Sequence, residues 1–276
     1  MPTRFHHLVV LFLFTTLAVN LRTATSFSAP SLRSSSSSAT SSSSSSSRLL
    51  AAADHDTLVP LDTEASIIEA SNFFVDNYYN SAEKPKDLYD LSSAQFLSSY
   101  APLLTPRTFP STLYFSPSLG LICGQTCLLS SDYSDLIRPS KSLDMYTSKM
   151  SSLSPKIRRT LKGKSIHSII STILPDYTTT TLLSNLIIPP PLRRSGNAKK
   201  LIDKLESTSS TSTVSLFVNE NNVGARELYK GRGYENVGRA YGNTEVHVMD
   251  DGSVGERDVD EVFMIKELRK VKSGGI

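Results

Sequence analysis

The sequence predicts an α+β fold in which a mixed central β-sheet of about six to seven strands is flanked by helices. Three observations support this fold class. Two segments with helical spacing of apolar residues come first, two extended runs that suit a hairpin follow, and strand and helix patterns alternate after them. The chain has 276 residues, of which 39% are apolar, so it is long enough for one or two domains with real cores.

The first elements follow from local spacing. Residues 57–62 are expected to form a short strand. Residues 64–81 and 87–104 place apolar side chains at nearly helical intervals, so each is expected to be a helix with one buried face. The two extended runs, 111–116 and 119–130, are split by a Pro-Ser pair and are expected to form a hairpin.

Both cysteines of the chain, Cys123 and Cys127, fall in the second extended run. Residues four apart on a strand are separated by about 13 Å, which is too far for a disulfide. We therefore expect two small core residues.

Residues 131–177 give weaker signals, because their serine and lysine content leaves no clean apolar stripe. One or two helices would fit this segment. We interpret it as an insert over the core, and a lid on the substrate side is one interpretation of its role.

The C-terminal part predicts alternating strands and helices, because β-branched and apolar runs alternate with amphipathic ones. Prolines end the first of these strands, since proline cannot donate to a ladder. The expected elements are a central strand at 178–190, a helix at 198–207, a strand at 211–220, a helix beginning at Asn222 and ended by Gly231 and Gly233, and a closing hairpin of 237–249 and 260–268 across a turn at 250–258.

The N-terminal segment has the composition of a targeting sequence. Residues 1–53 contain no Asp or Glu, and a short apolar run at 8–19 follows a basic residue. We interpret residues 1–26 as a signal peptide and the serine-rich residues 27–53 as transit-like, which leaves 54–276 as the folded domain. Together they resemble the bipartite plastid presequence of algae whose plastid lies inside an extra membrane. The alternative is a secreted protein with a serine-rich linker.

The formal net charge of +3 includes this cationic presequence, so the mature domain is close to neutral. Nothing in it indicates a nucleic-acid surface, and we expect no metal and no membrane attachment in the mature form.

The first candidate site lies where the strand at 178–190 gives way to the next helix. Backbone amides at the start of a helix have no intrahelical partner, and the helix dipole favours an anion there. The glycine lets the chain approach a ligand closely and two arginines add charge, so a diphosphate is the expected ligand. The alternative is a helix start with solvated arginines. The residues concerned are Arg193, Arg194, Ser195, Gly196, Asn197 and Ala198.

Two stretches then indicate a family. "LSNLIIPPPLRRSGNA" resembles motif A of the GNAT superfamily of N-acetyltransferases, with Arg193, Gly196 and Ala198 at the named positions of its pyrophosphate loop. Asn197 stands where the family usually has Ile. Downstream, "NVGARELYKGRGYE" resembles the superfamily's Asn-x-x-Ala-x-x-Leu-Tyr followed by a Gly-aromatic pair.

The resemblance implies a GNAT fold whose sheet is splayed at an acetyl-CoA site, with acetyl-CoA as co-substrate. By that resemblance, the backbone of Leu186, Ile187 and Ile188 would pair with the pantetheine arm, and an amide near Ile188 could hold the acetyl carbonyl oxygen.

The second motif adds Asn222 and Ala225 to the cofactor site and places Tyr229 near the sulfur. A phenol with a pKa of about 10 is a suitable acid for a departing thiolate. Core packing is the alternative for Tyr229, and a plain N-cap is the alternative for Asn222. No general base stands out: His167, His247, an acid near the third and fourth strands, and water are all open.

The end of the chain bears on the substrate. Tyr241 matches the position of a tyrosine that helps to hold a substrate N-terminus in peptide-directed members. We therefore expect an N-acetyltransferase that acts on protein N-terminal amines, lysines or both, with a protein or peptide amine as partner. The alternatives are a small-amine acetyltransferase acting on polyamines or amino sugars, and a GNAT-fold module that holds CoA without turnover.

Overall fold

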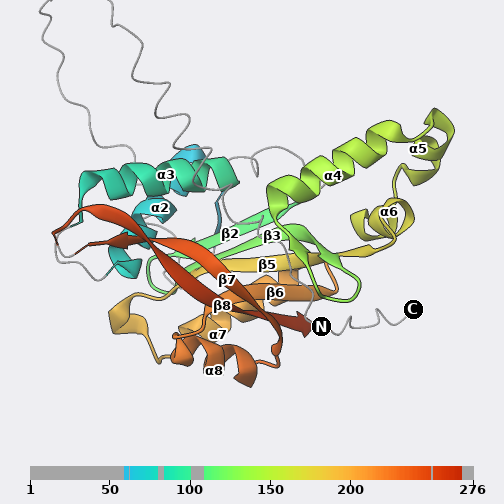
Figure 1. The fold of residues 1–276 in the computed structure, drawn as a ribbon. Helices are drawn as coiled ribbons and strands as arrows, with labels where there is room; N and C mark the ends of the chain where they lie inside the picture. The colour runs from blue at the N-terminus through green and yellow to red at the C-terminus, as the bar shows by residue number, and fades with distance from the viewer. Residues whose placement is uncertain (1–58, 62, 80–83, 101–108, 250, 269–276) are drawn as a thin grey trace, which may run out of the picture.

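The computed structural model describes residues 59–61, 63–79, 84–100, 109–249 and 251–268 (Figure 1). The signal peptide and the transit-like segment predicted over 1–53 lie outside these ranges. Among the helices of the described ranges, none combines the length and the apolar character that a membrane span requires.

The first half of the domain agrees with the local pattern. Its elements are β1 (Val59–Pro60), α2 (Glu64–Tyr78), α3 (Lys86–Tyr100), β2 (Ser111–Ser116) and β3 (Gly120–Ser130). A capping box fixes the start of α2, because the Thr63 side chain accepts from the amide of Ser66 and the Ser66 side chain accepts from the amide of Thr63. Strands β2 and β3 form the predicted hairpin, and Cys123 and Cys127 on β3 are free thiols in the core.

The remaining elements complete the sheet and its helices. They are β4 (Leu136–Ile137), α4 (Pro139–Ser152), α5 (Pro155–Leu161), α6 (Ile166–Ile173), β5 (Tyr177–Ile187), the short 3₁₀ helix η2 (Pro190–Leu192), α7 (Asn197–Thr208), β6 (Thr213–Asn219), α8 (Val223–Gly231), β7 (Glu235–Val248) and β8 (Val254–Glu267).

The sheet is mixed. Across the described residues, seven strands follow the order β1-β2-β3-β5-β6-β8-β7, and the two-residue β4 pairs with β3 outside that order. Strands β5 and β6 run parallel, and the other neighbouring pairs are antiparallel. The predicted α+β class with a mixed sheet flanked by helices is confirmed.

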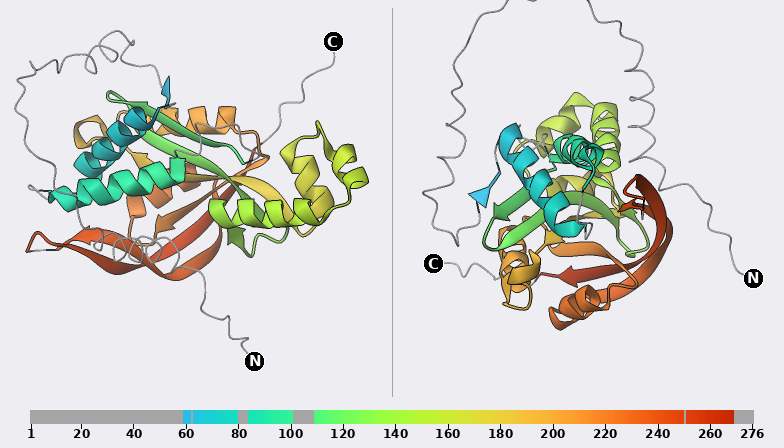
Figure 2. Two further views of the ribbon diagram at one scale, coloured as in Figure 1. Left: turned by 90° about the horizontal axis from the view of Figure 1, so that it is seen from above. Right: turned by 90° about the vertical axis from the view of Figure 1, so that its left-hand side faces the viewer.

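Helices cover both faces of this sheet (Figures 1 and 2). Helices α2 and α3 pack on one face, where Ile67 and Phe96 join the core around Leu121 of β3. Helices α7 and α8 pack on the opposite face. Helix α7 approaches β3 closely, because a Cβ at Gly124 would lie 2.4 Å from Cδ1 of Leu205. The two faces are called the α2 face and the α7 face below.

The segment 131–177 differs from the expectation of one or two helices. It forms three, α4 to α6, of which α4 and α6 pack around Ile170 and Leu128 of β3 in a small separate core. Serine N-caps at Ser154 and Ser165 start the two short ones, so they need no long apolar stripe. Figure 1 shows α5 and α6 at the end of the sheet where β5 begins, so they do not cover the loop after β5 as a substrate-side lid would.

The closing hairpin is longer than predicted. The turn expected over 250–258 is confined to the residues between Val248 and Val254, where the amides of Met249 and Gly252 bond across it. Residues 254–259 instead extend β8. Apolar and polar side chains alternate little along them, because this end of the hairpin is open to solvent.

Candidate active site

The two parallel strands separate at their carboxyl ends. Strand β5 pairs with β6 over Thr181 to Leu183 only, opposite Val214 to Leu216, although β5 continues to Ile187 and β6 to Asn219. Beyond this pairing the two strands present unpaired edges to each other. The splay that the sequence predicted is therefore present, and it opens next to the loop that follows β5.

A bulge in β5 accompanies the splay. Leu121 pairs with Ile187 and Cys123 with Ser184, so β5 has one extra residue opposite β3. Asn185, inside the bulge, has a φ of 50°, and its side-chain amide donates to the Tyr100 hydroxyl at 3.2 Å. Helix α3 thus holds the bulge from the α2 face.

Of the predicted strand residues, Leu186 and Ile187 form the end of β5 beside the gap, and Ile188 follows directly after the strand. Ile187 is buried and its carbonyl lies so close to Gly120 that a Cβ there would be 2.1 Å from the oxygen. Gly120 has a φ of 128°, so glycine is required at this point for both reasons. The β6 side of this edge stays open to a ligand backbone.

The loop from Arg193 to Ala198 leads into α7 with an unusual backbone. Arg194 has a φ of 61° and Gly196 a φ of 86°, and Gly196 is the N-cap of α7. Within the described chain, the amides of residues 194–199 meet no backbone or side-chain acceptor. Six consecutive free amides at a helix start are able to bind an anion, because the helix dipole adds to the individual N–H groups, and the binding of a diphosphate here stays a prediction.

Side chains of this loop fix its shape. The Ser195 hydroxyl donates to the Leu192 carbonyl at 2.6 Å, and the buried Asn197 side-chain amide donates to the same oxygen at 3.4 Å. Arg193 Nε donates to the Ile188 carbonyl at 3.1 Å, whereas Arg194 is exposed. Asn197 therefore supports the loop through its side chain and offers its amide to a ligand, and the arginines carry the positive charge.

Helix α8 begins and ends as the second motif predicts. Asn222 is the N-cap, and its Oδ1 accepts from the amide of Ala225 at 3.1 Å. At the other end, the Tyr234 amide donates to the Tyr229 carbonyl at 3.1 Å and the Gly233 amide donates to Lys230 at 2.9 Å. This is a Schellman motif, and its two aromatic rings pack edge to face at 5.6 Å.

Tyr229 itself is 6% exposed and lies in the core of the α7 face. Burial raises the pKa of its phenol above the usual value, so the phenol is protonated throughout the neutral range. Within the described residues its hydroxyl has no hydrogen-bond partner, yet it is not among the enclosed unpaired atoms. The ring is thus packed while the hydroxyl remains available, and its role as an acid stays a prediction.

Sequence reasoning missed a polar cluster on the α2 face, which consists of Arg138, Phe217, Asn243 and Glu261. The Arg138 guanidinium lies 5.7 Å from the centre of the Phe217 ring, and the Asn243 amide donates to Glu261 Oε2. The one local signal was Glu261 itself, a carboxylate that directly precedes the apolar run Val262 to Ile265 on an interior strand. Arg138 carried no signal, because it reaches the site from the start of α4.

Tyr241 lies in the middle of β7 and not directly before the turn, because the hairpin extends further than predicted. It falls at a bulge between Ala240 and Asn243 and is 65% exposed. It contacts Arg239, whose guanidinium pairs with Glu220 at 2.8 Å just after β6. Arg239, two residues before Tyr241, thus links this part of β7 to the carboxyl end of β6, and the role of Tyr241 toward a substrate stays a prediction.

Neither histidine considered as a base lies in the polar cluster. His167 on α6 lies 3.5 Å from Thr178 Oγ1, at the beginning of β5 and about 30 Å along that strand from Ile187. His247 pairs with Gly255 near the hairpin turn.

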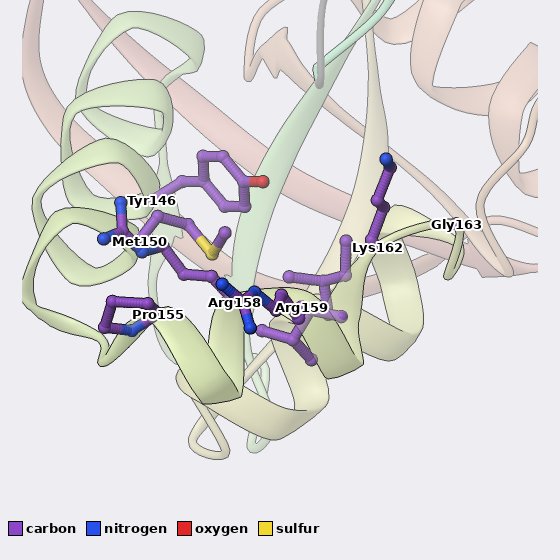
Figure 3. Close-up of a pocket in the computed structure, with 9 residues that line it drawn as sticks. Tyr146, Met150, Pro155, Arg158, Arg159, Lys162 and Gly163 are labelled. Carbon is purple, nitrogen blue, oxygen red and sulfur yellow. The ribbon is translucent and has the colours of Figure 1, made fainter.

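A hollow of about 500 Å³ lies between α4, α5 and α6 (Figure 3). Its floor includes Tyr146, Met150 and Leu161, and its rim carries Arg158 and Lys162. It belongs to the segment at the opposite end of β5 from the loop at 193–198, so it is not part of the candidate site.

Comparison with known families identifies the part of the chain that carries this site. Residues 163–249 match the family described as acetyltransferase (GNAT) domain. The matched range contains β5, the loop at 193–198, α7, β6 and α8, and it covers less than a third of the chain. None of the curated proteins compared with the chain matches it in sequence.

Several solved structures are similar at low identity. NAA60 of Arabidopsis thaliana in complex with acetyl-CoA is 15% identical, with a TM-score of 0.43, and the match covers 77% of this chain and 98% of that one. The ribosomal-protein-S18-alanine N-acetyltransferase of Escherichia coli is 12% identical, with a TM-score of 0.38, over 80% and 99%. The ribosomal-protein-alanine N-acetyltransferase of Brucella melitensis is 16% identical, with a TM-score of 0.40, over 77% and 99%.

Proposed function

We propose that the chain is an acetyl-CoA-dependent N-acetyltransferase that transfers the acetyl group directly to protein N-terminal amines, to lysine amines, or to both. The observation that carries the proposal is the run of free amides at residues 194–199, at the mouth of the gap between β5 and β6. The family match over residues 163–249 supports it, since this range contains both features.

The residues of the loop fit a diphosphate. Two adjacent phosphates need several N–H donors and positive charge, which the backbone from Arg194 to Ala198 and the two arginines supply. The free β5 edge at Leu186 to Ile188 would bind the amides of a pantetheine arm as a neighbouring strand would. The gap would then hold the thioester between the two strands.

Tyr229 supplies the acid in this proposal. Attack by the amine nitrogen on the acetyl carbon breaks the carbon–sulfur bond, and the sulfur leaves with the electron pair. The Tyr229 hydroxyl gives its proton to that thiolate and is reprotonated from solvent. Its raised pKa keeps the proton on the phenol until the thiolate forms.

A protein substrate is favoured over a small amine by Tyr241. Its ring is 65% exposed at the β7 bulge, two residues from Arg239, whose guanidinium pairs with Glu220 after β6, and it is therefore a suitable platform for an extended peptide. A polyamine or an amino sugar would not require such an exposed contact.

The test is acetylation of a mixed peptide library by the mature chain with acetyl-CoA, read by mass spectrometry at N-termini and at lysines. Polyamines and amino sugars are offered in parallel. Acetylation of peptides supports the proposal, whereas acetylation of small amines alone contradicts the protein substrate. Tight acetyl-CoA binding without turnover of any amine would show a non-catalytic CoA-binding module.

We also propose that the protein acts in a plastid, on the composition of residues 1–53. A fluorescent reporter fused to residues 1–53 should enter the plastid of an alga with a plastid inside an extra membrane. A matched fusion of residues 27–53 alone should stay outside the secretory pathway. Secretion of the first reporter would contradict the plastid location.

A further inference from the structure

Glu261 lies on β8, which pairs with β6 on the side away from the gap between β5 and β6, and its side chain is on the α2 face. Phe217 pairs with Phe263 and Asn219 with Glu261 across β6 and β8. The rings of Phe217 and Phe263 stack with centroids 4.8 Å apart, so both point to the same face. Because side chains two residues apart on a strand share a face, Glu261 points to that face as well.

Phe217 locates this carboxylate relative to the gap. Pairing between β5 and β6 ends at Leu183 and Leu216, and Phe217 is the next residue of β6. Tyr229 packs against the opposite face of the same strands. A thioester held between the strands would therefore have a phenol on the α7 face, and on the α2 face a carboxylate that has to reach it across β6, beyond Phe217.

Only one of the two Glu261 carboxylate oxygens accepts a hydrogen bond from the described residues. Asn243 donates to Oε2, and within the described residues Oε1 has no hydrogen-bond partner and is not among the enclosed unpaired atoms. One oxygen is thus anchored and the other remains able to accept a proton from a ligand. A carboxylate with one hydrogen-bonded oxygen and one oxygen without a partner is better suited to accept a proton than a carboxylate in a purely structural ion pair.

Charged groups around Glu261 come from two elements, and a third faces it with an uncharged side chain. Arg138, at the start of α4, favours the carboxylate form, and Glu245 on β7 disfavours it. Glu245 is itself occupied, because Arg257 Nε donates to it at 2.5 Å and the Tyr78 hydroxyl of α2 donates at 3.1 Å. Strand β6 faces Glu261 with the uncharged Asn219.

Burial outweighs these charges and raises the pKa of Glu261 above its ordinary value. A base works best when its pKa lies near the working pH, so the shift moves this carboxylate toward a usable range.

We propose that Glu261 is the proton acceptor for the attacking amine, a role that rests on the acetyltransferase function proposed above. Glu261 Oε1 takes one proton from the substrate ammonium, and the neutral nitrogen then attacks the acetyl carbon. The nitrogen loses its second proton to solvent as the amide forms, and the leaving sulfur gains one from Tyr229. One proton is released to solvent in the net reaction, after Glu261 and Tyr229 regain their starting forms.

The experiment compares Glu261→Gln with the wild type in the mature chain, using a peptide that the wild type acetylates. Glutamine keeps the shape and can still accept from Asn243, but it cannot take the proton. We expect kcat/KM to fall about a hundredfold or more. The loss of wild-type kcat/KM at acidic pH should vanish from the pH profile of the variant, and acetyl-CoA affinity should stay the same. Glu256→Gln, an exposed carboxylate on the same strand, should match the wild type.

The outcomes separate the two proposals. A wild type that acetylates no amine defeats the proposed function, irrespective of Glu261. An active wild type whose Glu261→Gln variant keeps the same rate, or loses rate with an unchanged pH profile, overturns the role of Glu261 alone. Glu261→Asp provides a second check, because a shorter carboxylate should restore the acidic limb of the profile with a lower rate.

Discussion

Tyr229 combines two properties that usually exclude each other in a tyrosine. Its ring is fixed by Tyr234 through the Schellman motif at the end of α8, and its hydroxyl has no partner within the described chain. Because the ring is packed rigidly, the Tyr229 side chain has little rotamer freedom left to lose when it reacts. An unpartnered phenol with a raised pKa is then ready to donate when a negative charge develops nearby.

Tyr229→Phe should lower kcat about a hundredfold while acetyl-CoA affinity stays within about twofold of the wild type. The free energy of unfolding should change by less than about 0.5 kcal/mol, because the deleted hydroxyl makes no hydrogen bond. Initial rates over a range of peptide concentrations and a urea melt measure the two effects. Full activity of the variant would show that Tyr229 is packing only.

Gly196→Ala tests the backbone of the loop at 193–198. A Cβ at Gly196 meets no atom within 4 Å, so the cost of the change comes from its φ of 86° alone. We expect a loss of about 1–2 kcal/mol in the free energy of unfolding or, if the loop shifts to relieve the strain, weaker acetyl-CoA binding.

Gly224→Ala is the matched control, since its Cβ also meets no atom within 4 Å but its φ is ordinary. It lies in the first turn of α8 and should stabilise the protein by up to about 1 kcal/mol. Denaturant titration and calorimetric titration with CoA read out both variants. Equal stability of the two variants would contradict the strain at Gly196.

Helix α7, the end of α8 and strand β8 are joined by one carboxylate. Glu206 of α7 accepts from Arg232 at 3.0 Å, from Lys266 at 2.7 Å and from the Tyr234 hydroxyl at 3.0 Å. Arg232 Nε is buried without a partner even with this contact in place. These bonds fix the helix that follows the loop at 193–198 relative to the helix that carries Tyr229.

Glu206→Ala should therefore destabilise the protein by about 2 kcal/mol or more, because three partners lose a charged acceptor in a half-buried site. Glu227→Ala removes an exposed pair with Lys230 on α8 and should cost less than about 1 kcal/mol. Thermal and urea unfolding of both variants give the comparison. Similar small losses would mean that Glu206 does not join the elements energetically.

In the molecule as a whole, a cluster of positive charge lies away from the proposed active site. Residues 138–174 carry eight basic side chains and one acidic one, although the complete chain has a net charge of only +3. Helix α5 and its C-cap Lys162 hold four of the basic groups, and Figures 1 and 2 show this helix projecting beyond the end of the sheet where β5 begins. The loop at 193–198 lies at the other end of that strand.

Replacing these four basic residues by Gln should leave kcat/KM for a short peptide within about twofold of the wild type. It should also leave unfolding within about 0.5 kcal/mol, because these side chains are exposed. Arg193→Gln is the control and should raise KM for acetyl-CoA about fivefold or more. A large loss from the α5 changes would show that this segment takes part in the site. The four residues are Lys156, Arg158, Arg159 and Lys162.

Some features of this protein depend only on neighbouring residues, and the sequence alone was sufficient to predict them. Helical spacing predicted α2, and the cap residue Asn222 and the glycines after Tyr229 predicted both ends of α8. The loop at 193–198 was predicted too, because the free amides of a helix start follow from the change of strand into helix. Such signals extend over one or two turns, so no tertiary structure is needed to read them.

Other features could not be predicted, because they join residues far apart in the chain. Arg138, Phe217 and Glu261 meet only after α4, β6 and β8 are placed, and no spacing in the sequence relates them. The sequence also did not predict how far β7 and β8 extend, because a two-stranded ribbon that is open to solvent does not need alternating apolar and polar residues. The helices of 131–177 lacked a clear stripe for a similar reason, since α5 and α6 are short and α4 and α6 contribute to a small separate core.

The sequence therefore determined the loop at 193–198, the helix that carries Tyr229 and the class of the sheet, all through periodicity and caps that act over a few residues. Only the tertiary structure decided where β5 and β6 part and which side chains face the gap. Strand pairing is a contact between distant segments, and its end at Leu183 and Leu216 depends on the bulge at Asn185 and on the packing of both faces. The pairing of β6 with β8 likewise places Glu261 on the face of the sheet opposite to Tyr229.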